Sequence, residues 1–405
     1  MVVGRKRPRR GIGLALSGGG YRATLFHIGA LRRLFELGVL QRADFRTISS
    51  VSGGSITAAG FATALAGLGR LPATLDEWKE KVETPLRTLT KSDIRTGIVA
   101  RKFLLPWHWT DGDYAVESFA ERLQKRLTPL MLRDLPASPS FAICATDLSF
   151  GANFIFTRNR MGSYLAGHMT PPADFPLARA VAASACFPPV FDPLPLGALA
   201  RELKGGAAPQ LERDASVEDI RLSDGGVYDN FGLEPIWKSH AVVLVSDAGG
   251  LFKGESDKSL LWRVKRYQAV QEEQTRRLRR RSLRIGFKKA SMAGASWSVG
   301  SVRRWPEGDA ASRDIGGYSR AFAVDVLAEI RTDLDAFSDL EAGVLMNHAY
   351  LSAAAAIARN VPQLCAENPP PLSPPAPDFL PPRVSEEELR RQLAGSSERH
   401  YKGRG

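Results

Sequence analysis

The amino-acid sequence predicts an α/β fold in which a largely parallel central sheet carries helices on both faces. Short apolar runs alternate along the chain with segments whose apolar residues recur at helical spacing. The first run, 11–16, leads through three glycines into a helical pattern over 21–38. The second run, 45–51, leads through a Ser-Gly-Gly turn into another helical pattern. Because neighbouring parallel strands need crossover helices, this alternation indicates a parallel sheet with both faces covered.

The same two patterns continue beyond this first repeat of strand, turn and helix. Further apolar, β-rich runs predict three more strands, and two long segments with helical spacing predict two more helices. These strands are expected at 141–146, 153–157 and 241–246, and the helices at about 260–283 and 339–359.

The chain is expected to consist of a basic start, one large domain and a tail. Residues 1–10 are basic, and 11–365 are expected to form the domain. Two regions, at about 71–132 and 253–318, are expected to be additions to its minimal α/β core.

The end of the chain has a different composition. Proline dominates from about Asn368 to Arg383, and the remaining residues are charged. We therefore expect 366–405 to be a flexible tail, with one weak helix at 386–393.

Composition points to a globular protein that contacts anionic partners. Of the 405 residues, 44% are apolar and 24% are charged, which are ordinary values for a folded domain. Three widely spaced cysteines argue against a disulfide framework and fit a reducing compartment. The apolar run after the basic start is too short for a signal peptide, and no stretch has the length and hydrophobicity of a membrane span. We expect a soluble protein that contacts membranes peripherally.

The net charge of +12 is concentrated in two clusters, one at the N-terminus and one over Arg276–Lys289. A basic helix attracts anionic lipid, and a basic run can also bind nucleic acid. The alternative without a binding role is that these basic residues form a solvent-exposed helix face. Nucleic acid is not expected, because no nucleic-acid fold or interleaved aromatic platform accompanies the charge.

The turn after the second strand has the pattern of a nucleophile elbow. Such a turn needs small residues two positions before and after the serine, so that strand and helix can approach closely. Around Ser52, Gly54 satisfies this rule, and Ser50 stands where glycine is usual. A serine in such a turn can also be a simple helix N-cap.

Three consecutive glycines follow the first strand. Gly18, Gly19 and Gly20 free the backbone to direct N–H groups toward an oxyanion at a helix N-terminus. The alternative is a dinucleotide-binding loop, because Gly18 to Ala23 nearly fits that glycine pattern. That alternative needs an acidic residue at the end of the next strand, whereas Asp44 precedes the strand.

The third motif is Asp224-Gly225-Gly226, which in isolation is typical of a turn. Its position in the order of glycine loop, serine elbow and Asp-Gly-Gly favours a catalytic carboxylate.

With these motifs together, the chain resembles the patatin-like phospholipase family, which is related to the catalytic domain of cytosolic phospholipase A2. The similarity covers roughly 11–249 and continues more weakly through 332–335 and the following helix. The residues that carry it are Ser17-Gly18-Gly19-Gly20-Tyr21-Arg22, Ser50-Val51-Ser52-Gly53-Gly54-Ser55, Ala145-Thr146-Asp147-Leu148, Ala178–Phe191 and Asp224-Gly225-Gly226-Val227-Tyr228-Asp229-Asn230.

The resemblance implies a three-layer α/β/α fold and a lipid acyl hydrolase, that is, a serine hydrolase of the phospholipase A or lipase type. It implies that Ser52 is the nucleophile and Asp224 its base, without a catalytic histidine. The implied oxyanion hole consists of backbone N–H groups of Gly18, Gly19, Gly20 and Gly53. Arg22 is expected either to shape the glycine loop or to meet a substrate phosphate.

The resemblance implies no cofactor and no metal, and it favours the cytoplasm. Two acidic residues near the motifs are expected to be less important than Asp224. We interpret Asp147 as a loop-holding acceptor, and Asp229 as a weaker alternative base. The main alternative function is a non-catalytic lipid- or nucleotide-binding protein with a vestigial serine.

Overall fold

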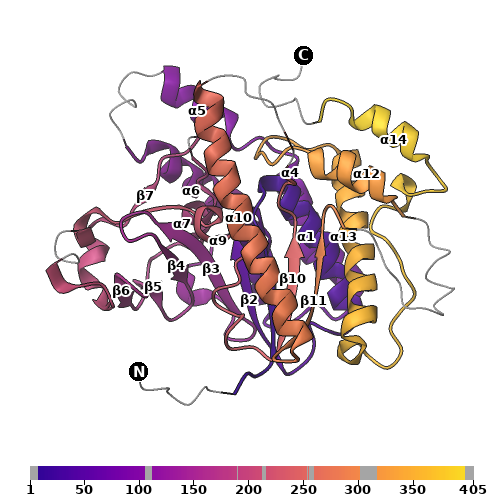
Figure 1. The fold of residues 1–405 in the computed structure, drawn as a ribbon, viewed down its shortest axis with the longest axis horizontal. Helices are drawn as coiled ribbons and strands as arrows, with labels where there is room; N and C mark the ends of the chain where they lie inside the picture. Colours follow the sequence, from indigo (N-terminus) through magenta and orange to yellow (C-terminus); the bar gives the residue numbers. More distant parts are fainter. Residues whose placement is uncertain are drawn as a thin grey trace.

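The structure is a computed structural model that describes residues 8–104, 112–188, 190–211, 216–252, 254, 260–301 and 317–396. Within these residues the chain forms a mixed, mostly parallel sheet with helices on both faces, as the sequence predicts (Figure 1).

Five strands form the parallel part of the sheet in the order β11-β10-β1-β2-β3. All five strands expected from the sequence are present, and four of them lie here. β11, within the second addition, was not predicted. The bounds are β1 Ile12–Leu16, β2 Phe45–Val51, β3 Ser140–Asp147, β10 Val242–Asp247 and β11 Ala293–Ser298.

Beyond β3 the described sheet becomes antiparallel, in the order β3-β4-β5-β6-β8. Two short strands branch from β3, because β9 pairs with the end of β3 and β7 pairs with β9. The bounds are β4 Ala152–Phe156, β5 Met161–Ser163, β6 Gly167–Met169, β7 Leu194–Pro195, β8 Lys204–Gly205 and β9 Arg221–Asp224.

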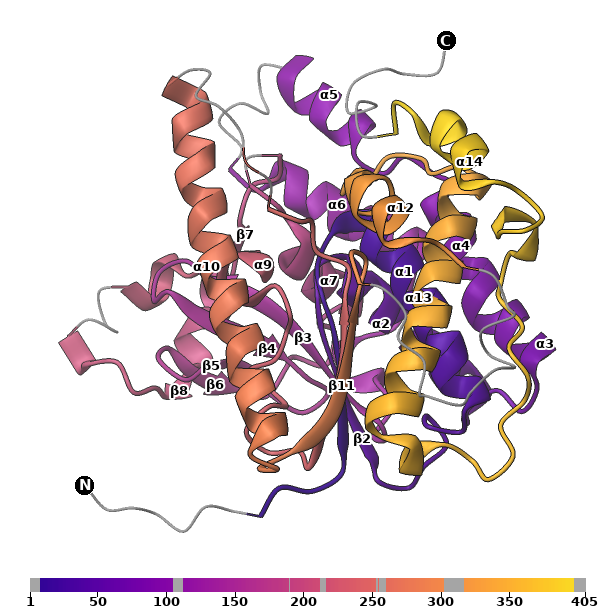
Figure 2. The ribbon, with the colours of Figure 1, turned by 45° about the vertical axis from the view of Figure 1, so that its right-hand side comes forward.

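The alternation of side chains along the central strands separates two apolar cores. Leu14 and Leu16 of β1 belong to the large core, whereas Ala15 belongs to a small cluster that includes Leu283. Figure 2 shows α1 and α13 on one side of the sheet and α10 on the other. The principal helices are α1 Gly20–Glu36, α2 Gly53–Leu68, α7 Leu177–Ala185, α10 Leu260–Lys288 and α13 Asp339–Asn360. This arrangement is the expected three-layer α/β/α fold.

The first predicted addition, 71–132, is mainly helical in its described part. Its helices are α3 Leu75–Trp78, α4 Thr84–Thr90, α5 Thr96–Leu104 and α6 Tyr114–Arg126. The remaining short helices are α9 Gly226–Asp229, α12 Arg320–Asp325 and α14 Glu386–Leu393.

Part of the segment 366–396, which was expected to be a flexible tail, packs against α1 and α13. The side chain of Asn347 on α13 donates to the carbonyl of Ala376 at 2.6 Å and accepts from its N–H at 2.9 Å. Arg32 on α1 donates to the carbonyl of Ser373 at 2.9 Å. Leu389 on the predicted helix α14 is buried. Proline leaves carbonyls free for such contacts and loses little backbone entropy on ordering, so a proline-rich segment can pack as a strap. Residues 397–405 lie outside the described part.

None of the described helices combines the length and the hydrophobicity that crossing a membrane requires.

Candidate active site

Ser52 sits in a strained turn between β2 and α2. Its backbone has φ 52° and ψ −121°, and the other described non-glycine residue with positive φ is Ala290. A side-chain-bearing residue adopts this conformation only where the surrounding structure enforces it. Strain of this kind is typical of the strand-to-helix turn that presents a nucleophilic serine.

Close backbone packing enforces the turn. A methyl group added to Gly54 would overlap the carbonyl oxygen of Leu16, and one added to Gly53 would overlap that of Gly20. The small-residue rule therefore holds on the helix side. On the strand side, the hydroxyl of Ser50 accepts from Ser55 Oγ at 3.1 Å, so the extra atoms are accommodated in a hydrogen bond.

Strand pairing brings Asp224 to Ser52. Val51, the last residue of β2, pairs with Cys144 of β3, and Asp224 of β9 pairs with Ala145, the next residue along β3. Because β2 and β9 pair with successive residues of β3, the end of β2 that leads into Ser52 lies next to Asp224. Segments 172 residues apart are joined here through a third strand.

The Asp224 carboxyl has the environment of a base rather than of an ordinary aspartate. Burial raises its pKa to about 7, even though the Gly226 N–H and the nearby Ser52 hydroxyl lower it. The Gly226 N–H donates to Oδ1 at 2.7 Å. Oδ2 is buried and has no hydrogen-bond partner among the described residues, so the Ser52 hydroxyl is close to the carboxyl without completing a hydrogen bond.

Ser184 on α7 connects the segments that carry Ser52 and Asp224, a role not predicted from the sequence. Its Oγ accepts from the Ser52 N–H at 2.9 Å and donates to the Cys144 carbonyl at 2.6 Å. Its own carbonyl accepts from the Gly225 N–H at 3.1 Å. The serine within Ala182-Ala183-Ser184-Ala185 was the available signal, but its partners are distant in sequence.

The glycine loop lies beside Ser52, but its three residues differ in role. The Gly18 N–H donates to the carbonyl of Asn230 at 3.0 Å, so the prediction that it binds an oxyanion is wrong. Gly19 and Gly20 line the same cavity as Ser52 and have φ of 137° and 55°, values that favour glycine. Their N–H groups, and that of Gly53, stay predicted oxyanion donors.

Arg22 shapes this loop and does not contact the cavity. The side chain is buried, and its guanidinium donates to the carbonyls of Ala248 at 2.8 Å, Ala328 at 2.8 Å and Ile330 at 2.7 Å. Because these carbonyls occupy its donors, the prediction that Arg22 binds substrate is corrected: it ties three segments together behind the glycines.

His27 is also structural. Its Nε2 lies 2.9 Å from the carbonyl of Ser17 and its Nδ1 lies 2.8 Å from Ser246 Oγ. A carbonyl can only accept, so the proton is on Nε2. Burial lowers the pKa of His27 to about 4, which keeps the ring neutral at pH 7.

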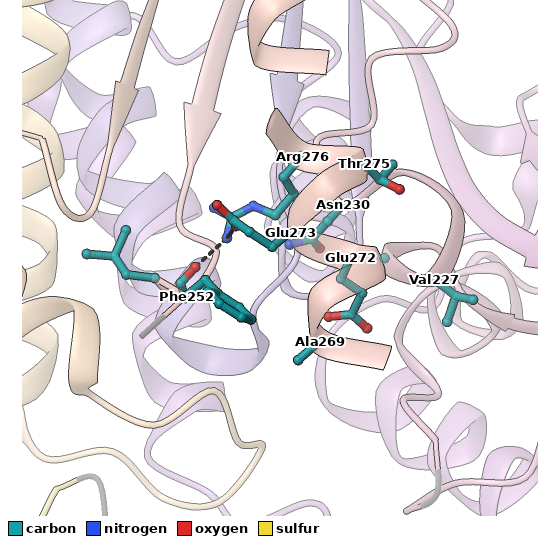
Figure 3. Close-up of a pocket in the computed structure, with 11 residues that line it drawn as sticks. Val227, Asn230, Phe252, Ala269, Glu272, Glu273, Thr275 and Arg276 are labelled. Atoms are coloured by element: carbon teal, nitrogen blue, oxygen red, sulfur yellow. Dashed lines mark hydrogen bonds and ion pairs between the residues drawn. The ribbon is translucent and has the colours of Figure 1, made fainter. Parts of the chain in front are cut away.

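A cavity of about 380 Å³ contains both Ser52 and Asp224. Phe187, Phe191 and Leu334 provide apolar walls suited to an acyl chain. A second cavity of about 220 Å³ adjoins it beneath α10 and shares Asn230 and Glu272 with it. Figure 3 shows this second cavity, with Glu272 projecting from α10.

Asp147 and Asp229, the two other acidic residues near the sequence motifs, do not line these cavities. Asp147 accepts from the N–H groups of Ser149 and Phe150, as the loop-holding interpretation expects. Asp229 accepts from backbone N–H groups and pairs with Arg279 at 3.1 Å. The Asp229 carboxylate therefore holds the turn after α9 and binds α10.

The dinucleotide alternative does not fit the geometry. Asp44 lies just before β2, whereas the glycine loop follows the carboxyl end of β1. Because β1 and β2 are parallel, Asp44 lies at the amino ends of these strands, whereas the glycine loop lies at their carboxyl ends. It pairs with Arg42 at 2.8 Å. Within the described ranges, no group of three or more His, Cys, Asp or Glu side chains could hold a metal ion.

Comparisons with known proteins found a matching family model and similar solved structures. The family model described as Patatin-like phospholipase matches residues 14–237. Human GIVD cytosolic phospholipase A2 is similar in structure, with a TM-score of 0.47 and 12% identity over 88% of this chain and 62% of that chain. VipD from Legionella pneumophila has a TM-score of 0.33 and 13% identity over 86% of this chain and 66% of that chain. No curated protein matches the chain.

Proposed function

The chain belongs to the patatin-like phospholipase family, and from this premise we propose that it hydrolyses carboxylic esters of membrane lipids with Ser52 as nucleophile and Asp224 as base. The observation that carries the proposal is a strained serine beside a buried carboxyl whose pKa is raised to about 7, inside a cavity with apolar walls.

The proposed reaction has two steps. Asp224 takes the Ser52 proton as Oγ attacks the acyl carbon, and the resulting tetrahedral intermediate expels the alcohol, which takes that proton. Water then attacks the acyl-enzyme in the same way and releases a fatty acid and free Ser52. Asp224 alone can serve as the base because a pKa near 7 makes it far more basic than an aspartate of ordinary pKa, about 3.9.

Stabilisation of the oxyanion is assigned to N–H groups of Gly19, Gly20 and Gly53. Both glycine segments begin helices, α1 and α2, so the helix dipoles favour negative charge at this point. Preorganised donors of this kind commonly contribute about 100-fold or more to the rate.

The proposal extends to peripheral membrane contact through α10, though not through every residue of 276–289. Arg276, Arg279 and Arg280 face inward and pair with Asp247 and Asp229. Arg281, Arg284, Lys288 and Lys289 are exposed and form no ion pair with any described residue.

Apolar side chains share this outer face. Tyr267, Leu278 and Ile285 are separated by about three turns and then two turns of helix, so they lie along one stripe. Their exposed fractions are 67%, 57% and 47%. Large apolar side chains beside unpaired cations fit an anionic lipid surface better than water.

Charge reversal tests this contact. We expect Arg281→Glu, Arg284→Glu and Lys288→Glu together to weaken binding to phosphatidylglycerol vesicles at least about 100-fold. Loss of each cation removes roughly 1 kcal/mol, and repulsion by the new carboxylates adds to that loss. The measurement is made in the Ser52→Ala background, so that hydrolysis does not alter the vesicles. Reversal of the exposed Lys125, Arg359 and Arg390 on other helices is the control. Equal loss in both triple variants would refute the assignment of the contact to α10, and dimers in place of vesicle binding would assign the stripe to a second copy.

A fluorophosphonate probe tests the reaction, because only an activated serine reacts with it. We expect labelling of the wild type and of Ser282→Ala, which alters an exposed serine, but not of Ser52→Ala. Mass spectrometry of a bacterial lipid extract should show free fatty acids with the wild type alone. Lipid binding without labelling would support the non-catalytic alternative. The cytoplasmic location stays a prediction.

A further inference from the structure

Glu272 is an acidic residue in the wall of the catalytic cavity that the proposed reaction does not use. It lies on the inner side of α10 and lines both the cavity that holds Ser52 and the adjoining one. Its side chain is partly buried. A carboxylate in this position meets whatever part of a substrate lies on the α10 side of the scissile ester.

Glu272 forms no ion pair with any residue that the structure describes, although the charge of Arg276 acts on it. Gln268 on the same helix donates to Oε1 at 3.5 Å. The adjacent Glu273 pairs with Arg277 at 2.7 Å. Arg276 pairs instead with Asp247. It also donates to the carbonyl of Gly250 (Figure 3).

The other charges around the cavity leave this imbalance in place. Arg95 and Asp333 form an ion pair in its wall, so they largely compensate one another. Asp224 changes its protonation during the proposed reaction. Burial raises the pKa of Glu272, while Gln268 and Arg276 lower it. In its ionised form this carboxyl places a negative charge in the wall of the cavity.

We propose that Glu272 makes this cavity select lipid esters whose head groups carry no net negative charge. The inference rests on the proposed hydrolase function and gives its substrate class. A partly buried charge repels a like charge more strongly than an exposed one does, because the local dielectric is lower. An ammonium-bearing phospholipid and an uncharged acylglycerol both satisfy the requirement, whereas phosphatidylglycerol does not.

The head-group preference of the cavity would be opposite to that of the protein surface. The exposed cations of α10 favour docking on an anionic bilayer, and the cavity would then admit the neutral or zwitterionic lipids of that bilayer. Binding and hydrolysis would therefore have opposite head-group preferences.

The test compares kcat/KM at about pH 8 for phosphatidylglycerol, phosphatidylethanolamine and diacylglycerol in the same uncharged detergent micelles, which removes the effect of bilayer charge. We expect the wild type to disfavour phosphatidylglycerol about tenfold, a modest effect for a like charge in a partly buried site. Glu272→Gln keeps the shape of the side chain. It should reduce the ratio of kcat/KM between the other lipids and phosphatidylglycerol to about twofold. Glu273→Gln, which alters the neighbouring carboxylate, should keep the wild-type ratio.

The outcomes separate the two proposals. An unchanged ratio in Glu272→Gln, or no preference in the wild type, would overturn this inference while Ser52 labelling still upheld the hydrolase. Absence of both labelling and hydrolysis of every lipid would end both. A ratio is measured because Glu272 also affects Asp224, and an effect on the base cancels between substrates. Equal turnover of phosphatidylethanolamine and diacylglycerol would show that the cavity requires only a head group without net negative charge. A preference for phosphatidylethanolamine would show that the cavity recognises the ammonium group.

Discussion

On one face of the sheet, α1 and α2 meet at the active site through close backbone contacts, whereas on the other face α10 is held mainly by ion pairs. Gly53 and Gly54 leave no room for a side chain, and the core around them is extensive and apolar. Beneath α10 the apolar cluster is small, and Arg276 and Arg279 pair with Asp247 and Asp229. The comparison teaches that Ser52 is positioned by steric exclusion, whereas α10, which lines the same cavity, is positioned by charge.

The largest effect is expected from filling the close approach at the elbow. Gly54→Ala places a methyl group against the carbonyl oxygen of Leu16 and must move α2. A misplacement of about 1 Å can cost on the order of 100-fold, so we expect kcat/KM to fall at least that far. Gly67→Ala, on the same helix with open space around it, is the control. Comparable activity of the two variants would show that steric exclusion does not determine the geometry of the turn at Ser52.

A smaller effect is expected at Arg22, behind the glycine loop. Arg22→Met leaves three carbonyls without their donor, and we expect a loss of about 3 kcal/mol in the free energy of unfolding. Denaturant titration measures it. Arg42→Met, which removes a partly exposed arginine paired with Asp44, should cost less than about 1 kcal/mol. Equal costs would contradict a clamping role for Arg22.

The pH dependence links the two faces. Below a pH of about 7, Asp224 is protonated and cannot accept the Ser52 proton, so kcat/KM should rise about tenfold per pH unit up to that midpoint and then level off. The charge of Glu272 on α10 also raises the pKa of Asp224. Glu272→Gln should therefore move the midpoint to lower pH. A midpoint near pH 4 in the wild type would contradict the role of Asp224 as a base with a raised pKa.

The smallest effects are expected in the ion pairs that hold α10. Arg276→Ala removes a buried partner of Asp247 and should cost about 2 kcal/mol of unfolding free energy. Arg280→Ala removes a more exposed partner and should cost less than about 1 kcal/mol. Unfolding measured at low and high salt should show greater screening for the Arg280 contact than for the Arg276 contact. Identical costs and salt responses would mean that burial does not distinguish the two arginines.

Local patterns predicted the elements that depend on local contacts. The predicted strand at 45–51 and the predicted helix at 386–393 coincide with β2 and α14. Ser52 and Asp224 were predicted through the order of their motifs, and the structure places both in one cavity. β11 and the packing of 366–396 were missed, because strand pairing with β10 and contacts with Arg32 and Asn347 join segments far apart in the sequence.

The same reason explains the wrong assignments in the site. A glycine triplet looks uniform in sequence, but the carbonyl of Asn230 takes the Gly18 N–H and leaves Gly19 and Gly20 at the cavity. A basic residue after the loop suggested a phosphate, but burial among backbone carbonyls makes Arg22 a clamp. Which of several chemically similar groups faces the cavity depends on distant partners.

The sequence by itself determined the alternating α/β plan, the tight serine turn and the order of the chemical groups, because hydrophobic periodicity and glycine placement act over a few residues. Only the tertiary structure decided that the pKa of Asp224 is raised to about 7, that Ser184 joins the segments of Ser52 and Asp224, and that Glu272 lines the cavity. Those properties arise from burial and from contacts between remote segments, and they exist only once the chain has folded.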